Sequence, residues 1–168
     1  MKRIIIEFLI IIAAFILQST VFRAISLGGI VPNLLIIVTA SFGIMRGKKE
    51  GMFVGFVCGL LEDIFFGEIL GFYALIYTFI GYLNGIFQSM FYPEDVKLPM
   101  SLISASEALY CFICYIFLFL LRGKLHLGYY IVHVILPEIV YTIVITIALY
   151  RGILFVNEKL ESGLPGRK

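Results

Sequence analysis

The sequence predicts an all-helical integral membrane protein, built as a single bundle of six transmembrane helices. Three observations lead to this class: 61% of the 168 residues are hydrophobic, the mean hydropathy is +1.06, and the charged residues gather between long apolar runs. A soluble domain is nearer half apolar, and a soluble chain of this composition would expose large apolar patches. Lipid is therefore the expected solvent. The small net charge of +2 gives no support to nucleic-acid binding.

The apolar runs divide the chain into six expected helices, most of them near the roughly 20 residues that a bilayer core of about 30 Å requires. Pro32 is expected to open the second helix, and Gly67 and Gly71 to flank a tight turn before the fourth. The charged segment RGKKE at 46–50 is expected to be a loop. The expected helices span residues 4–22, 32–45, 51–66, 70–90, 100–121 and 129–150, followed by a polar tail at 151–168.

Six spans place both termini on one side of the membrane, and the distribution of cations identifies that side. With cytoplasmic termini, ten of the 13 Lys and Arg residues fall inside, and three, Arg23, Arg122 and Lys124, fall outside. The positive-inside rule therefore predicts a multi-pass protein of the cytoplasmic membrane with its termini in the cytoplasm. The loops are too short to fold alone, so residues 1–168 are expected to form one domain.

A ladder of small residues marks the third expected helix. Gly51, Gly55 and Gly59 recur every four residues, and Asp63 is the next step of the same series. Positions four apart lie on one helix face, so this face is small and ends in an acid. Small faces let helices approach closely in lipid, so we interpret it as a packing surface, within the bundle or for another protein. The fourth expected helix carries a second such pair, Gly81 and Gly85.

Polar side chains from four expected helices are predicted to converge on a layer in the outer half of the membrane. At about 1.5 Å per residue, Asp63 lies about 18 Å from the cytoplasmic edge, and Glu138 about 12 Å below the outer edge. Such groups are costly in hydrocarbon and face the bundle interior, so Asp63 is expected to point inward and Glu62 to be rotated away. Only Glu107 and Asn84 are placed in the inner half. The expected outer polar layer comprises Gln18, Asn33, Glu62, Asp63, His133 and Glu138.

The sequence carries no catalytic signature. It has no H-E-x-x-H, no G-x-S-x-G and no phosphate-binding loop, and the adjacent acids Glu62 and Asp63 point about 100° apart on a helix. The C-x-x-C at 111–114 is interpreted as a pair of small packing residues. Pro137 removes the hydrogen bond to the His133 carbonyl and is expected to kink the sixth helix. We therefore expect no enzymatic activity, no cofactor and no metal.

Several segments of the chain resemble the MreD family of bacterial rod-shape-determining proteins. They are LQST at 17–20, VPNLLIIV at 31–38, and FGIMRGKKEGMFVGFVCGLLEDIFFGEILGFYALIYTFIGYLNG at 42–85. In the last of these, the glycines, Asp63, Leu70-Gly71 and Ala74-Leu75 fall in the family's order. The fifth and sixth expected helices resemble the family only in their general character.

The resemblance implies a non-enzymatic membrane scaffold of the cell-elongation complex. Such a protein is implied to bind MreC, a partner with one membrane span and a large extracytoplasmic domain. The complex is implied to couple MreB filaments to the glycosyltransferase and transpeptidase enzymes that make peptidoglycan. Membrane lipid and a second copy of the chain are further expected contacts. The fold is implied to resemble the substrate-binding subunit of energy-coupling-factor transporters.

The alternative function is that of such a vitamin-binding transporter subunit, which an outward polar pocket would suit. Those subunits typically carry A-x-x-x-A on the first helix, whereas this chain has the adjacent pair Ala13 and Ala14. The scaffold is therefore preferred, and its expected docking surfaces are the two glycine faces and the outer polar layer.

Overall fold

The described residues of the chain form six helical rods. The computed structural model describes residues 2–26, 29–67, 69–92, 96–120 and 127–162. The first three rods are α1 (Lys2–Ile16) with the π-helical η1 (Leu17–Phe22), α2 (Leu34–Arg46) and α3 (Lys48–Phe66). The other three are α4 (Phe72–Ile86) with the 3-10 turn η2 (Phe87–Met90), α5 (Lys97–Cys114) with the π-helical η3 (Tyr115–Leu120), and α6 (Leu127–Tyr130) with the π-helical η4 (Ile131–Ile135) and α7 (Leu136–Ser162). The all-helical class predicted from the sequence is confirmed.

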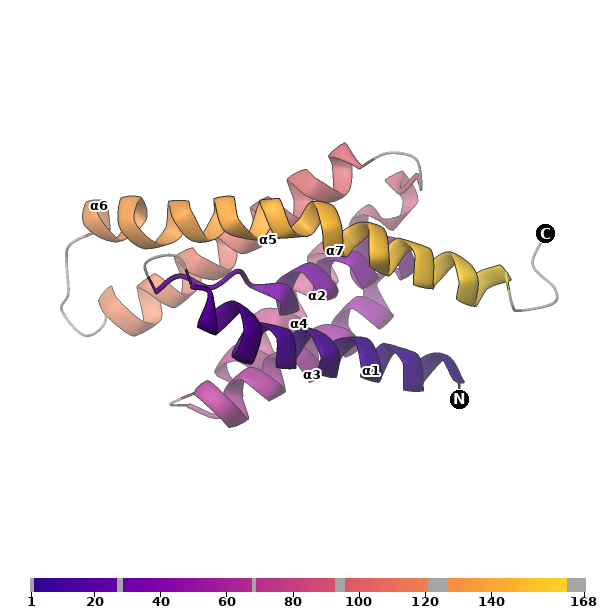
Figure 1. The fold of residues 1–168 in the computed structure, drawn as a ribbon, viewed down its shortest axis with the longest axis horizontal. Helices are drawn as coiled ribbons and strands as arrows, with labels where there is room; N and C mark the ends of the chain where they lie inside the picture. Colours follow the sequence, from indigo (N-terminus) through magenta and orange to yellow (C-terminus); the bar gives the residue numbers. More distant parts are fainter. Residues whose placement is uncertain (1, 27–28, 68, 93–95, 121–126, 163–168) are drawn as a thin grey trace.

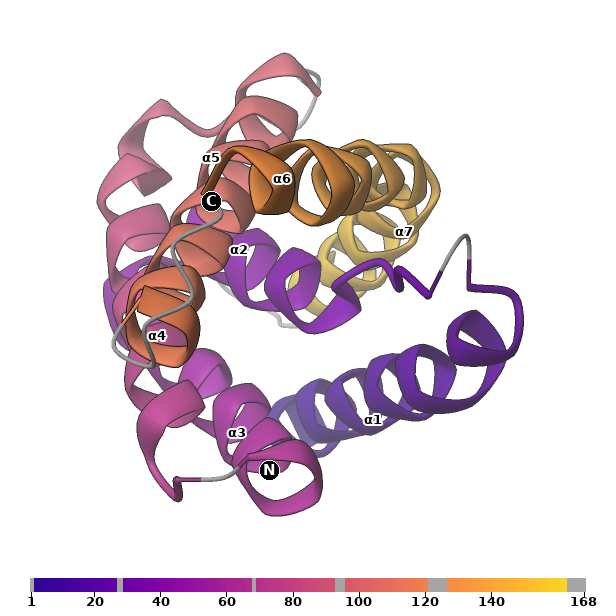
Figure 2. The ribbon, with the colours of Figure 1, turned by 90° about the vertical axis from the view of Figure 1, so that its left-hand side faces the viewer.

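Helix α2 lies at the centre of the bundle. Every residue from Leu34 to Met45 is buried, and a view along the molecule shows the other rods arranged around it (Figure 2). At about 1.5 Å per residue, its 13 residues span roughly 20 Å, which is shorter than a bilayer core. Its neighbours cover it on all sides, so α2 forms the core of the fold and presents little surface to lipid.

Among the described residues, three helices are long and apolar enough to cross a membrane, namely Ile4–Phe22, Lys97–Phe117 and Ile131–Lys159. Large apolar side chains such as Leu9 and Val144 face outward from them and are about 60% exposed, as lipid-facing residues would be. The first residues of α1 and the last residues of α7 lie at the same end of the molecule (Figure 1). This arrangement agrees with termini on one side of a membrane.

The glycine ladder of α3 packs directly against α4. Gly51 lies against Gly81, and Gly59 lies against Ala74. A Cβ atom added at any of the following glycines would come within 3.0 Å of the other helix's backbone: Gly51, Gly55, Gly59, Gly81 and Gly85. Both glycine faces are therefore helix-packing surfaces inside the chain. Since α3 and α4 already fill them, they offer no room for a helix of another protein.

Helix boundaries differ from the expected ones at several places, and three of the differences change how the rods connect. Helix α2 begins after Pro32, because the Asn33 side chain caps it by accepting a hydrogen bond from the N–H of Ile36 at 3.2 Å. The expected loop at 46–50 is reduced to Gly47, whose φ of +94° turns the chain directly from α2 into α3. Helix α7 continues to Ser162, so much of the expected polar tail is helical.

Pro137 follows an interruption in its helix. The π-helical η4 contains His133, and regular α-helix resumes at Leu136. Pro137 has no N–H to donate to the carbonyl of residue 133, so a change of hydrogen-bond pattern at this point is its physical consequence.

Candidate functional site

Polar side chains from several rods meet around one cavity of about 230 Å³. A second hollow of about 520 Å³ adjoins it and shares four of its lining residues. We call the two together the polar cavity. The first part is lined by Gln18, Gly29, Ile30, Val31, Asn33, Glu62, Tyr110, Val134 and Glu138, and the second part adds Ser19, Arg23, Ser26 and Phe66. Four residues of the expected outer polar layer, Gln18, Asn33, Glu62 and Glu138, therefore lie around this cavity.

Gln18 joins the first three rods at the cavity wall. Its Nε2 donates a hydrogen bond to Oε1 of Glu62 at 2.8 Å. Its Oε1 accepts a hydrogen bond from the backbone N–H of Leu35 at 3.2 Å. The N–H groups in the first turn of a helix have no partner within the helix, so Gln18 satisfies one of them from η1.

Asn33 fixes the buried start of α2. Its backbone N–H donates to Oγ1 of Thr142 on α7 at 3.1 Å, and its Oδ1 accepts from the Ile36 N–H and from the Tyr77 hydroxyl at 2.9 Å. The first turn of α2, which carries the partial positive charge of a helix N-terminus, lies at the same cavity as the acidic side chains. It therefore contributes favourable electrostatics to them.

Asp63 lies outside the cavity lining, which corrects the expectation that it would point inward there and Glu62 away. Its carboxylate accepts hydrogen bonds from the backbone N–H groups of Gly71, Tyr73 and Ala74 at 2.9 to 3.0 Å, and so caps α4. The glycine face of α3 is turned toward α4, so the next step of the ladder falls at the start of α4. Glu62, about 100° around the helix, faces the cavity instead.

His133 also lies apart from the cavity. It is exposed, and its ring stacks on Tyr129 with 4.1 Å between the ring centroids. The guanidinium of Arg23 lines the outer hollow and lies 5.6 Å from the centroid of the Phe66 ring. Arg122 and Lys124, the other two cations expected on the outer side of the membrane, lie outside the described residues.

Glu107 lies close to Glu138, although the two acids were expected at different depths in the membrane. The Cys111 thiol is 3.9 Å from Oε1 of Glu107 and 3.7 Å from Oε2 of Glu138. The depth estimate started α5 at residue 100 and the last rod at residue 129, whereas they begin at Lys97 and Leu127. Measured from these observed starts, Glu107 lies about 15 Å along its rod and Glu138 about 17 Å along the last rod. The two rods pack together, so the acids can meet. In the sequence, the four-residue spacing of Glu107 and Cys111 was the feature that could have indicated that these two side chains lie together.

A second polar cluster, at the end of α2 away from the cavity, was missed by the sequence analysis. The side chain of Arg46 is buried, with 2% exposed, and pairs with Glu7 and with Glu50, the latter at 3.3 Å. Its Nε donates to Oδ1 of Asn157 at 2.6 Å. One guanidinium thus joins α1, α2, α3 and α7. Arg46 was assigned to a charged loop because it begins the RGKKE segment.

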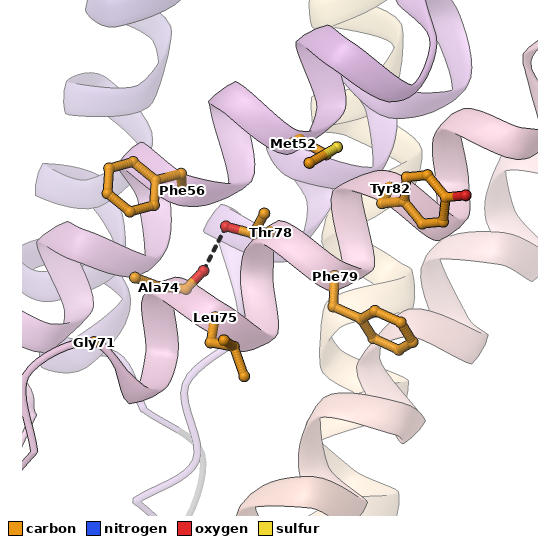
Figure 3. Close-up of a pocket in the computed structure, with 8 residues that line it drawn as sticks. All are labelled: Met52, Phe56, Gly71, Ala74, Leu75, Thr78, Phe79 and Tyr82. Atoms are coloured by element: carbon orange, nitrogen blue, oxygen red, sulfur yellow. Dashed lines mark hydrogen bonds between the residues drawn. The ribbon is translucent and has the colours of Figure 1, made fainter.

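An apolar groove of about 590 Å³ runs along the outer surface of α3 and α4 (Figure 3). We call it the α3–α4 groove. Leu75 and Phe79 project from α4 beside it and are 74% and 49% exposed. Smaller residues of α4 lie between the bulky ones. The groove is lined by Met52, Phe56, Gly71, Ala74, Leu75, Thr78, Phe79 and Tyr82.

Comparison with known proteins gives the chain a family. No curated protein and no solved structure matches it. It does match the family described as rod shape-determining protein MreD, over residues 2–157 of 168. This range takes in the polar cavity, both glycine faces, the α3–α4 groove and all six rods up to the last turns of α7. The chain therefore belongs to the MreD family of rod shape-determining membrane proteins.

Proposed function

We propose that this chain is a non-enzymatic scaffold of the bacterial cell-elongation complex. In this role it binds MreC in the cytoplasmic membrane and helps to couple MreB filaments to the glycosyltransferase and transpeptidase that make peptidoglycan. The observation that carries the proposal is the match to the MreD family over residues 2–157. The buried polar groups favour it too, since the bonds of Gln18, Asn33 and Asp63 run to helix ends and hold rods together.

The scaffold is proposed to cross the membrane six times, with both termini in the cytoplasm. In support, the start of α1 and the end of α7 lie at one end of the bundle (Figure 1). The Arg46 cluster and the exposed Lys48 and Lys49 mark the proposed cytoplasmic end of α2 and α3. In this arrangement the short, covered helix α2 crosses only with the help of its neighbours, because its polar ends are satisfied by their side chains.

The comparisons give no support to the vitamin-transporter alternative, because the family that matches is a rod-shape family. The likeness of the fold to the substrate-binding subunits of those transporters stays a prediction.

The α3–α4 groove is the surface that we propose for the membrane span of MreC. Small residues at a helix surface let a second helix approach closely, and in lipid this packing supplies much of the association. Gly71, Ala74 and Thr78 give the groove such a lining, and Ala74 and Thr78 lie between Phe56 and Phe79 (Figure 3). The glycine faces cannot serve, since α3 and α4 fill them. The polar cavity is then left to the segment of MreC that leaves the membrane, or to a second copy of the chain.

Site-specific photocrosslinking in cells tests this proposal. A photoreactive residue replaces Leu75 or Phe79 in the groove, or Val140 or Val144 on the far side of the bundle, where both valines are 58% exposed. We expect crosslinks to MreC from the groove positions and none from α7, because the groove combines small and bulky residues as a helix-docking surface does. Each variant is first checked for its ability to sustain rod shape.

Two results would count against the proposal in different ways. Crosslinks to MreC from Val140 and Val144 alone would move the interface to α7 and leave the scaffold role standing. If MreC neither crosslinks from any position nor co-purifies with the wild-type chain, the scaffold proposal fails.

A further inference from the structure

Two acids and a thiol form a cluster where α5 packs against α7. Glu107 and Cys111 are one turn apart on α5, and Glu138 lies in the first turn of α7. One ligand atom of each residue lies within 4.8 Å of the other two. Glu107 is fully buried and Cys111 is 3% exposed. Three side chains of types that bind metals therefore converge on one point in the interior.

Among the described residues, no cation pairs with the carboxylates of this cluster. Oε2 of Glu107 is buried and has no hydrogen-bond partner in the part of the chain that the structure describes. Within that part, neither Glu107 nor Glu138 forms an ion pair with a Lys, Arg or His side chain. Buried charges in proteins are paired or coordinate metals, because their desolvation is otherwise too costly. Two carboxylates this close also repel each other unless they share a proton or a cation.

The distances in the cluster suit a tetrahedral metal ion. Zinc lies about 2.3 Å from a thiolate sulfur and 2.0 to 2.2 Å from a carboxylate oxygen, which puts sulfur and oxygen about 3.5 Å apart around the ion. The Cys111 sulfur lies 3.7 and 3.9 Å from the nearest oxygens of the two acids. A small rotation of each carboxylate would close the difference, since the terminal torsion of Glu is broad.

The ligand types select the class of metal. A thiolate is a soft ligand that favours zinc and its neighbours, whereas Mg²⁺ and Ca²⁺ require oxygen ligands throughout. Three protein ligands leave a fourth position for water. Glu138 also lines the polar cavity, which gives the ion a route in and supplies that water. On binding, the Cys111 thiol gives up its proton to the water of the cavity.

We propose that Glu107, Cys111 and Glu138 bind one divalent transition-metal ion of the zinc class, which fastens α5 to α7 beside the polar cavity. This site is independent of the scaffold role: its failure would leave the crosslinks to MreC unchanged.

Cobalt titration of the purified full-length chain tests the site. The protein is prepared in mild detergent with an affinity tag that contains no histidine, and is stripped with a chelator. Co²⁺ is then added and followed by absorption, since a cobalt–thiolate bond gives a charge-transfer band. We expect about one Co²⁺ per chain, a charge-transfer band that Zn²⁺ removes by competition, and no competition from Mg²⁺ or Ca²⁺.

Matched variants assign the ligands. Cys111→Ser is expected to abolish the charge-transfer band, and Glu107→Gln and Glu138→Gln to weaken cobalt binding by about tenfold or more. Cys114→Ser changes a buried thiol one turn away on α5 that lies outside the cluster, so its band should equal that of the wild type. If Cys111→Ser does not fold, as judged by size-exclusion chromatography, cobalt binding by Glu138→Gln, a change at the cavity wall, is compared with that of Cys114→Ser instead.

Three outcomes would overturn the site. The first is a folded wild-type chain that gives no cobalt–thiolate band, which would leave a proton shared among the three groups. The second is a band that persists in Cys111→Ser, and the third is one lost in Cys114→Ser as well. Either would mean that the ion is bound adventitiously elsewhere on the chain.

Discussion

The carboxylate of Asp63 accepts a hydrogen bond at 2.9 Å from the backbone N–H of Ala74, eleven residues further along the chain. The same carboxylate accepts from the N–H groups of Gly71 and Tyr73. The last turn of α3 therefore caps the first turn of α4, where a negative charge is also favoured by the helix dipole. Gly71, with a φ of +96°, turns the chain so that these N–H groups face back toward Asp63.

Asp63→Ala should destabilise the α3–α4 pair, because three N–H groups lose their acceptor. A buried unsatisfied donor costs about 1–3 kcal/mol, so the loss should exceed that of an ordinary cap. Asp63→Asn retains one acceptor oxygen, so its stability should lie between that of the wild type and that of Asp63→Ala. Thermal unfolding in detergent measures both, with Glu62→Gln as the neighbouring control, since its amide oxygen can still accept from Gln18. An unfolding temperature of Asp63→Ala equal to that of Glu62→Gln would refute the capping role.

Gly55→Ala should destabilise the chain, whereas Gly152→Ala should not. A methyl group at Gly55 would press on the backbone of Tyr77, and a helix backbone gives way poorly. Overpacking of this kind costs about 1–3 kcal/mol or more. Gly152 has no atom within 4 Å of an added Cβ, so alanine there should gain about 0.5–1 kcal/mol from helix propensity. The two unfolding temperatures should move in opposite directions; a shift of equal size and sign would contradict the close packing.

The glycine ladder illustrates what periodicity can and cannot predict. The four-residue spacing of Gly51, Gly55 and Gly59 identified a face suited to close helix contact, and the structure has such a contact. Spacing carries no information on what covers a face, so α4 could not be distinguished from a partner's helix. Asp63 was expected in the outer polar layer, but it lies on the glycine face, and that face packs against α4, so its carboxylate binds the start of α4.

The sequence alone could not predict which rods are neighbours, and therefore which side chains of distant rods bond to each other. Gln18, Asn33, Glu62 and Glu138 were predicted from the helix rise to share one layer, and these residues do line one cavity. The contacts of Arg46 depend on which rods are neighbours, and a cation beside two lysines is most simply assigned to solvent. Its burial becomes understandable only when α2 is seen to be enclosed by the other rods (Figure 2).

Gln18→Leu should loosen the attachment of the first rod to the bundle. The change keeps the size of the side chain but removes the bonds to Glu62 and to the Leu35 N–H, leaving a buried acid and a helix N–H with fewer partners. We expect a loss of about 1–3 kcal/mol in the free energy of unfolding. Ser19→Ala is the matched control, because the Ser19 hydroxyl donates to carbonyls of its own helix. Equal unfolding temperatures for the two variants would argue against this role of Gln18.

Arg46→Met should be the most damaging of the single changes at the opposite end of α2. It retains an unbranched apolar stem but removes the charge that pairs with Glu7, which is 4% exposed, and with Glu50. Breaking a buried pair by removing one partner typically costs about 3–5 kcal/mol, because the other charge is left in a poor environment. Lys49→Met, an exposed cation three residues away, should be nearly neutral.

A double-mutant cycle separates this pairing from simple loss of packing. If Arg46 and Glu7 stabilise the bundle through each other, Glu7→Gln should be less costly in the Arg46→Met background than alone. The coupling between such contacting groups is typically about 0.5–3 kcal/mol. Additive effects within about 0.5 kcal/mol would mean that Arg46 acts through its stem and its bonds to Glu50 and Asn157, and not through Glu7. Because the cluster joins four rods, a large coupling would also explain how the short helix α2 keeps its charged end inside the bundle.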